Sequence, residues 1–140
     1  MYEARYPIFN IGAMDLYLKK RKGFVKLALT TGTSLLPTIG FGENELYDIV
    51  DTHLSRLLQK FFVATINCPA PLCNGAFGFI PFKHPLVTVI GQPIKVERVD
   101  NPSQEQIDNL HSVYIAKLQD LYDAHKNEYH AYRKEDMRIV

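Results

Sequence analysis

The sequence has almost no excess charge of either sign. Sixteen lysine and arginine residues stand against fifteen aspartate and glutamate residues in a chain of 140, so the formal charge is +1. Binding of nucleic acid through a broad basic field needs a larger excess, and we therefore expect no nucleic-acid partner. The basic cluster "LKKRK" at residues 18–22 is typical of a solvated surface, with contact to anionic lipid or a cofactor phosphate as the alternative.

Cysteine is also scarce, with only Cys68 and Cys73 in the chain. Two cysteines are too few for a disulfide framework, and a C-x4-C pair without a second pair of ligands is a weak metal signal. We expect both to be buried or incidental thiols of a protein from a reducing compartment, and we expect no metal site.

The sequence also lacks an apolar run typical of a signal peptide or a transmembrane helix. The opening "MYEARYPIFN" carries charges and a proline where a signal peptide needs an apolar core. The longest uncharged run, residues 61–82, contains several Pro, Gly and Asn residues. Because such a backbone cannot satisfy its own hydrogen bonds in lipid, we expect no spanning segment. The sequence also lacks the Walker A, G-x-G-x-x-G, G-x-S-x-G and H-E-x-x-H motifs, which removes the commonest short catalytic signatures.

The first half of the chain predicts two helices around one strand. Apolar spacing predicts an amphipathic helix over residues 16–31 that ends at Gly32. The segment "SLLPTIGF" predicts a buried strand, with Pro37 confined to a strand end, a bulge or an edge. A second helix is expected to begin near Glu43 and to carry an apolar stripe as far as Phe61.

The second half predicts strands followed by a closing helix. Residues 67–82 are too rich in Pro and Gly for a long element, and residues 86–96 predict a buried strand that bends at Gly91. Asn101 as N-cap, Pro102 and Gln104 predict the start of a helix that fades near His130. We expect residues 133–140 to form a charged, frayed tail. The predicted class is α/β, with a mixed, partly parallel sheet and flanking helices.

Several ordered motifs carry a resemblance to one enzyme family. They are "RKGF" at residues 21–24, Gly32, "LP" at 36–37, "FGEN" at 41–44, "GFIPFKHPLVTVIGQPIKV" at 78–96, and His111 with Tyr114 in an H-x-x-Y arrangement. In this order and spacing they resemble the type-2 acyl-CoA:diacylglycerol acyltransferases, together with the monoacylglycerol acyltransferases and wax synthases. The resemblance covers nearly all of residues 16–126.

The resemblance implies one acyltransferase domain over residues 1–140, the C-terminal part of a glycerolipid-acyltransferase-like core. It implies transfer of a fatty acyl group from acyl-CoA, as co-substrate, to diacylglycerol or a related acylglycerol or alcohol in triacylglycerol synthesis. No bound cofactor is implied. The implied partners are acyl-CoA, acylglycerol lipid and the membrane surface at the cytosolic face of the endoplasmic reticulum, and a homo-oligomer stays an open alternative.

The chain departs from the family pattern where the chemistry is expected. The family's upstream apolar hairpin and its His-Pro-His-Gly motif, whose His is thought to be the general base, are absent from this sequence. We therefore assign no catalytic residue here and expect the base to lie upstream in a longer gene product. The alternative is a catalytically inactive remnant that binds lipid or a partner.

The resemblance and local chemistry together select five candidate substrate-binding residues. Arg21 and Lys22 open a helix, where cations and free amides favour the phosphates of coenzyme A, and a solvated turn is the alternative. Gly42, Glu43 and Asn44 come from "FGEN". For Gly42, as for Gly23, turn geometry or close backbone approach is the simpler role, and for Glu43 it is pairing with a helix dipole.

The sequence predicts no catalytic role for the histidines. His111 lies beside an apolar stripe and is expected to pack in the core, as is Tyr114. His130 is expected to be an exposed residue next to the tail, although its spacing to Glu135 imitates the H-x4-D form of the wider acyltransferase superfamily. His53 and His84 have no acidic partner nearby in the sequence, and we assign them no role.

Overall fold

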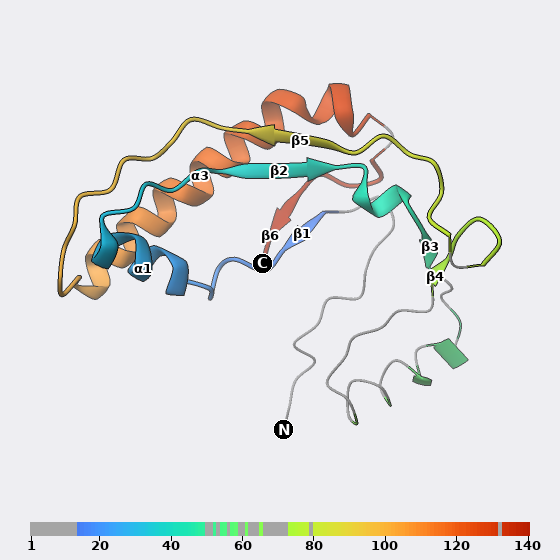
Figure 1. Cartoon of the computed structure of the whole chain (residues 1–140), viewed down its shortest axis with the longest axis horizontal. Coiled ribbons are helices and arrows are strands. Elements are labelled where there is room, and N and C mark those ends of the chain that lie inside the picture. The colour runs from blue at the N-terminus through green and yellow to red at the C-terminus, as the bar shows by residue number, and fades with distance from the viewer. Residues whose placement is uncertain are drawn as a thin grey trace.

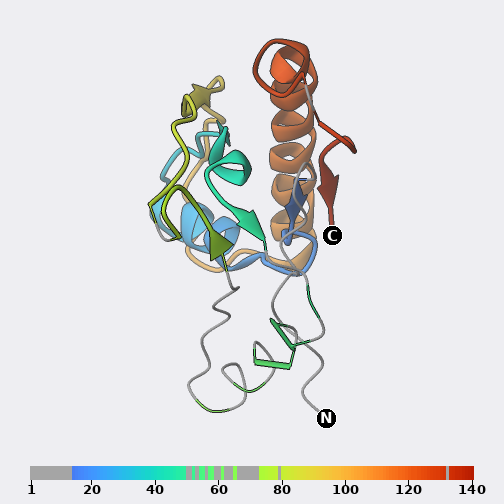
Figure 2. The same cartoon turned by 90° about the vertical axis from the view of Figure 1, so that its right-hand side faces the viewer.

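A long helix organises the fold. The computed structural model describes residues 14–49, 52, 54–55, 57–58, 61, 65, 73–78, 80–131 and 133–140. Helix α3 (Gln104–Tyr129) crosses behind an antiparallel strand pair, β2 (Thr38–Phe41) and β5 (Val87–Ile90), and helix α1 (Gly23–Thr31) lies at one end of that pair (Figure 1). In the turned view α3 stands between the β2·β5 pair and β6 (Arg138–Ile139) (Figure 2).

Strand pairing confirms the α/β class but not a single mixed sheet. The described residues form three two-stranded sheets: β2 with β5, β1 (Asp15–Leu16) with β6, and β3 (Asp48–Ile49) with β4 (Cys73–Asn74). Among the strand pairs of the described residues, the longest is antiparallel and only β1·β6 is parallel. Antiparallel pairing sets Ile39 opposite Val89 and Phe41 opposite Val87, so the apolar residues of both strands share the face toward α3.

Helix α1 ends where predicted and begins later than predicted. Gly32 adopts the left-handed φ of 70° that a C-cap glycine favours, and its N–H donates to the carbonyl of Ala28. The expected start near Leu16 is wrong, because Leu16 belongs to β1 and a turn closed by the Arg21 N–H on the Leu18 carbonyl precedes the helix.

The helix expected from Glu43 is replaced at its start by other structure. Glu43–Glu45 form one 3-10 turn, η1, and Asp48–Ile49 then pair with β4. The described residues 54–55, 57–58, 61 and 65 are helical, whereas Leu46, Tyr47 and Thr52 are described and not helical. The remaining positions of the predicted helix, including His53, and also Cys68 lie outside the described residues. A pairing partner more than twenty positions away decides the conformation of Ile49, and its helical spacing does not.

Helix α3 begins two residues later than predicted. Its N-cap is Ser103, whose hydroxyl accepts from the Gln106 N–H while the Gln106 side chain accepts from the Ser103 N–H. This reciprocal capping box satisfies two free helix donors, and it displaces the predicted Asn101 cap. The end of the helix at Tyr129 agrees with the prediction.

The core has two parts along α3. One joins Ile39 and Phe41 of β2 to Leu118 and Tyr122 of α3, and the other joins α1 to the first turn of α3. Strand β5 is not the buried strand that we predicted. Its residues alternate between half-buried and exposed because only one face of the pair is covered.

The last eight residues are ordered rather than frayed. Met137 is buried against the first core cluster, and β6 pairs with β1. The Arg138 guanidinium donates to both carboxylate oxygens of Asp15, at 2.8 and 3.0 Å. The charges that suggested a free tail are used to hold the end of the chain against β1.

Candidate functional site

The five candidate residues fall into two groups that the fold keeps apart. Arg21 and Lys22 precede α1, whereas Gly42, Glu43 and Asn44 follow β2. Figure 1 shows α1 and η1 at opposite ends of β2. The sequence grouped them as substrate-binding candidates, and the structure places them at two separate positions.

The basic position is partly occupied by internal contacts. The Lys22 ammonium donates to the Asp108 carboxylate at 2.7 Å, which ties the start of α1 to α3 and lowers the pKa of the Asp108 carboxyl. No side chain caps α1 at Lys22, and its first turn contains no acidic residue. Arg21 is exposed. An anion at this helix start would therefore meet Arg21 and free amides, while Lys22 already has a carboxylate partner.

Gly42 is required by the backbone. Its φ is 93°, and a Cβ at this position would lie 2.2 Å from the Pro85 carbonyl oxygen. The expected structural role of Gly42, turn geometry with close backbone approach, is confirmed. The same expectation is wrong for Gly23, where a Cβ would meet no atom within 4 Å and φ is not positive.

Glu43 and Asn44 lie in a single 3-10 turn. Glu43 is exposed and Asn44 is half-buried. The Glu43 carboxylate folds back over β2, since a Cβ at Gly40 would be 3.1 Å from its Oε1 atom. A turn of three residues has little dipole, so the role that we expected for Glu43 at the start of a helix is wrong. Substrate binding by Glu43 and Asn44 stays a prediction.

A buried histidine joins this turn to the end of α3. His130, the C-cap of α3, is only 5% exposed. Its Nδ1 lies 3.2 Å from the Tyr122 hydroxyl, and its Nε2 lies 3.9 Å from Oε1 of Glu45 in η1. The expectation of an exposed His130 is wrong, because the rings of Phe41 and Tyr122 pack against it. One sequence signal could have predicted this burial: His130 follows Tyr122 by eight residues, which places it near the buried face of the helix.

The His130 network is suited to positioning. Tyr122 is fully buried, so its hydroxyl cannot reach a substrate. Burial lowers the pKa of His130, with Glu45 acting in the opposite direction, and burial raises the pKa of Tyr122. A neutral imidazole with one donor and one acceptor nitrogen fits a hydroxyl on one side. The network holds η1, and with it Glu43 and Asn44, against α3.

The buried His130 predicts a stability that falls in mild acid. Its pKa is lowered in the folded protein, so the unfolded chain takes up the proton first as the pH drops below the ordinary value of about 6.5. The free energy of unfolding should therefore decrease from pH 8 to pH 5, measured by urea unfolding. His130→Gln, which does not titrate, should flatten the dependence in this range. An equally steep dependence in His130→Gln would assign the effect to other groups.

His111 has the packing role that the sequence predicted. It is buried, its Nε2 lies 3.0 Å from the Leu18 carbonyl oxygen, and its ring and that of Tyr114 pack against Phe24. A satisfied ring nitrogen in the core is a structural contact between α3 and the segment before α1.

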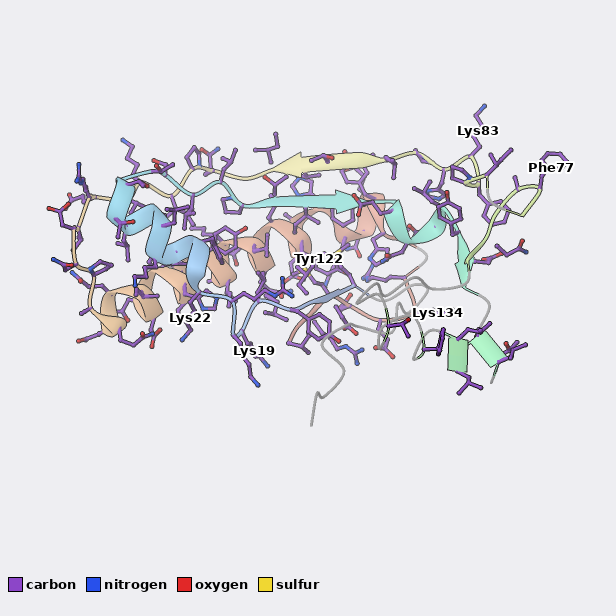
Figure 3. All side chains as sticks on the ribbon, turned by 60° about the horizontal axis from the view of Figure 1, so that its bottom comes forward. Lys19, Lys22, Phe77, Lys83, Tyr122 and Lys134 are labelled. Atoms are coloured by element: carbon purple, nitrogen blue, oxygen red, sulfur yellow. The ribbon has the colours of Figure 1, made fainter. Side chains whose placement is uncertain are left out.

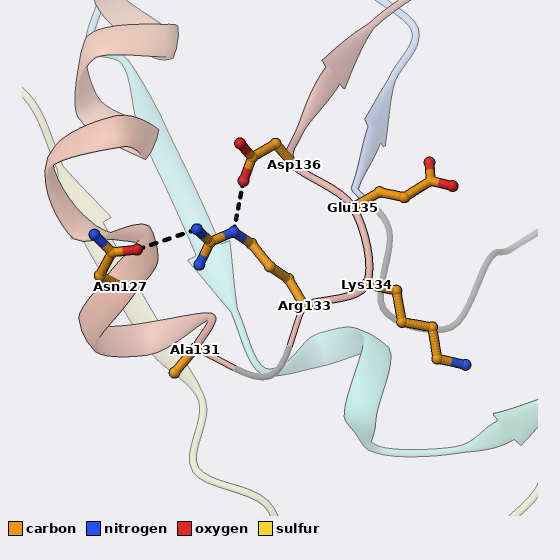
Figure 4. Close-up of a pocket in the computed structure, with 6 residues that line it drawn as sticks. All are labelled: Asn127, Ala131, Arg133, Lys134, Glu135 and Asp136. Carbon is orange, nitrogen blue, oxygen red and sulfur yellow. Dashed lines mark hydrogen bonds and ion pairs between the residues drawn. The ribbon is translucent and has the colours of Figure 1, made fainter.

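A polar hollow lies at the C-terminal end of α3 (Figure 4). Its volume is about 490 Å³, and it is lined by Asn127, Ala131, Arg133, Lys134, Glu135 and Asp136. The Arg133 guanidinium donates to the carbonyls of Lys126 and His130, to the Asn127 amide oxygen and to Asp136. These bonds cap the last carbonyls of α3. A charged lining is the opposite of what an acyl chain requires, so we assign the hollow a structural role.

Comparison with known proteins identifies the class. The family model described as "Diacylglycerol acyltransferase" matches residues 9–140. The chain belongs to the diacylglycerol acyltransferase family, as the motifs indicated.

Its relatives include members with different named acceptors. The chain is 38% identical over 142 residues to human "Diacylglycerol O-acyltransferase 2-like protein 6", covering 92% of this chain and 42% of the relative. It is 42% identical to "Diacylglycerol O-acyltransferase 2B" of Umbelopsis ramanniana, covering 92% and 41%, and 39% identical to human "Acyl-CoA wax alcohol acyltransferase 1", covering 81% and 38%. The chain thus spans about two fifths of the length of these relatives, and no solved structure matches it.

The described residues show neither a membrane span nor a metal cluster. They contain no helix long and apolar enough to cross a membrane. Within the same part of the chain, no three His, Cys, Asp or Glu side chains gather as a metal site would require.

Proposed function

We propose that this chain forms the C-terminal portion of an O-acyltransferase that moves a fatty acyl group from acyl-CoA to diacylglycerol, or to a related acylglycerol or alcohol, in triacylglycerol synthesis. The observation that carries the proposal is the family match over residues 9–140. Relatives named for diacylglycerol and for wax alcohol support both types of acceptor. Activity at the cytosolic face of the endoplasmic reticulum membrane belongs to the same proposal.

The reaction defines which parts this chain can supply. The acceptor hydroxyl oxygen attacks the thioester carbon, the C–S bond breaks, coenzyme A leaves as thiol, and a base takes the hydroxyl proton. Donors must stabilise the oxyanion, and the acyl chain needs a dry channel. We assign the base outside this chain. The segment from α1 through β2 to η1 would form a wall of the site, with Arg21 near the phosphates of coenzyme A and Glu43 and Asn44 near the reacting groups.

The alternative of an inactive lipid-binding or partner-binding remnant is less favoured, because the similarity to enzymes extends across nearly the whole chain. A remnant would retain the packing residues without a requirement for Glu43 or Arg21. The two functions therefore differ in what a substitution at an exposed candidate residue does to turnover.

The direct test uses the product isolated from its native cells. Its intact mass is measured first, and the same preparation is then supplied with radiolabelled oleoyl-CoA and either diacylglycerol or a long-chain alcohol. Labelled triacylglycerol or wax ester is the expected product. A folded preparation that labels neither acceptor would contradict the proposal.

A substitution tests the site. Glu43→Ala in the native-length protein should lower kcat with the folded yield unchanged, whereas Glu97→Ala, at another exposed glutamate, should leave turnover unchanged. Loss of activity in proportion to loss of folded protein in Glu43→Ala would assign Glu43 a structural role alone.

A further inference from the structure

A tight turn after β4 presents a phenylalanine to solvent. Gly75 and Gly78 exchange both backbone hydrogen bonds, at 2.9 and 3.1 Å, so the chain reverses through Ala76 and Phe77. The Phe77 side chain is 94% exposed. Figure 1 shows the turn projecting beyond β3 and β4 at one end of the molecule, and Figure 3 shows Phe77 at its outer edge.

Two local properties of Phe77 are unfavourable in water. Its φ of 55° is in the left-handed region, which glycine adopts readily and bulky residues rarely adopt. A fully exposed phenyl ring also forgoes the free energy of burial. Strained backbone conformations cluster at functional sites, so Phe77 is a candidate for a functional residue.

The surroundings of the turn are apolar and end in a cation. Residues 75–82, "GAFGFIPF", contain no charged side chain, and Lys83 follows them. Ile80 and Leu86 are both more than half exposed. Figure 3 shows Lys83 at the same end of the molecule as Phe77.

A second apolar element lies at this end. Leu54, Leu57 and Phe61 are helical, spaced as i, i+3 and i+7, and each is more than 60% exposed. This spacing sets them on one face of a helix. Figure 1 shows the helical fragments on the same side of the molecule as β3 and β4.

The shape and charge of the turn favour a lipid surface over a protein pocket. A stable protein interface needs roughly 800 Å² per partner with matched shape, whereas a projecting turn offers a small convex tip. A bilayer interface needs no shape complementarity, accepts aromatic rings at headgroup depth and attracts lysine to anionic headgroups.

We propose that the turn Gly75–Gly78 inserts Phe77 into the interfacial layer of a lipid bilayer, with Ile80 in the same segment, Lys83 at the headgroups, and the exposed stripe Leu54, Leu57 and Phe61 on the same side of the molecule. This inference rests on the membrane part of the proposed function and names the surface of the chain that faces lipid. Its test contains no acyl-CoA, so it can fail while acyl transfer succeeds.

The sequence contains no tryptophan, so a single introduced tryptophan reports on its own position by fluorescence. The Phe77→Trp variant carries one fluorophore at the tip, and Val113→Trp carries one on α3 at a side chain that is also partly exposed. Both full-length variants are mixed with vesicles of phosphatidylcholine with or without phosphatidylserine, and with vesicles of brominated lipid. The emission of Phe77→Trp should shift to shorter wavelength and be quenched by bromine, and that of Val113→Trp should change little.

A second pair of variants measures affinity. Burial of the phenyl ring in the bilayer interface makes the free energy of partitioning more favourable. Phe77→Ser should therefore lower partitioning into vesicles by roughly tenfold, whereas Val113→Ser should leave it unchanged. Matching circular dichroism spectra control for folding. Equal quenching at both positions, vesicle binding without a change at position 77, or no binding by the folded protein would each overturn the proposal.

Discussion

Replacing Gly42 with alanine is expected to lower the free energy of unfolding by at least about 2 kcal/mol. Two costs combine at this position. A side chain is strained at a φ of 93°, and its Cβ would lie 2.2 Å from the Pro85 carbonyl oxygen, so the backbone of one segment must move. Urea unfolding of the purified protein, followed by circular dichroism, measures the loss.

Gly23→Ala is the matched control. A Cβ at Gly23 would meet nothing within 4 Å, and Gly23 is the first residue of α1. Alanine favours a helix more than glycine does, so Gly23→Ala should be neutral or slightly stabilising. Equal unfolding midpoints for Gly42→Ala and Gly23→Ala would show that the 42–85 backbone contact is not formed.

Replacing Phe41 with alanine should cost about 3–5 kcal/mol, the range for truncating an aromatic side chain in a packed core. Phe41 is 1% exposed, its ring stacks with that of Tyr122 at 6.1 Å, and it also contacts Tyr129 and His130. The cavity would open between β2 and α3, which are the two elements that the first core cluster joins. Differential scanning calorimetry and urea unfolding should agree on the loss.

Phe77→Ala provides the comparison with the same chemical change. Because Phe77 is 94% exposed, its truncation should alter the free energy of unfolding by no more than about 0.5 kcal/mol. A similar loss in Phe41→Ala and Phe77→Ala would mean that Phe41 is not in the core, or that the tip is covered in the folded protein.

Local signals predicted the features that depend on a few adjacent residues. Gly32 ends α1 as expected, because a left-handed C-cap is a local property. The packing of His111 and the end of α3 near His130 followed from the helical stripe. The start of α3 was missed by two residues, because Asn101 and Ser103 both have a side chain that can cap and only the bonds to Gln106 distinguish them.

Contacts between distant residues account for the larger errors. Ile49 has helical spacing but pairs with Cys73, and the charged end of the chain is held by Asp15 at the other side of the β1·β6 pair. The exposed position expected for His130 is wrong in part because its partners Glu45 and Phe41 lie more than eighty positions away; only its spacing of eight residues from Tyr122 was a local signal of burial. Contacts between residues so far apart in the chain produce no local periodicity, so a single sequence does not reveal them.

In the candidate site, too, local motifs were predictable and the distances between them were not. The sequence predicted five residues from local motifs, and the structure explains why Gly42 must be glycine. It also separates Arg21 from Glu43 by placing α1 and η1 at opposite ends of β2. Motif order along a chain carries no information about the distance between two motifs in space.

The sequence by itself determined the family, the α/β class and the C-terminal ends of α1 and α3, because these rest on residue types at short and regular spacing. Only the tertiary structure decided the antiparallel direction of β2 and β5, the burial of His130 against Tyr122 and the exposure of Phe77. Each of these depends on which distant segment occupies the space beside a residue. That competition is settled by packing and hydrogen bonding of the whole fold, and local propensity contributes little to it.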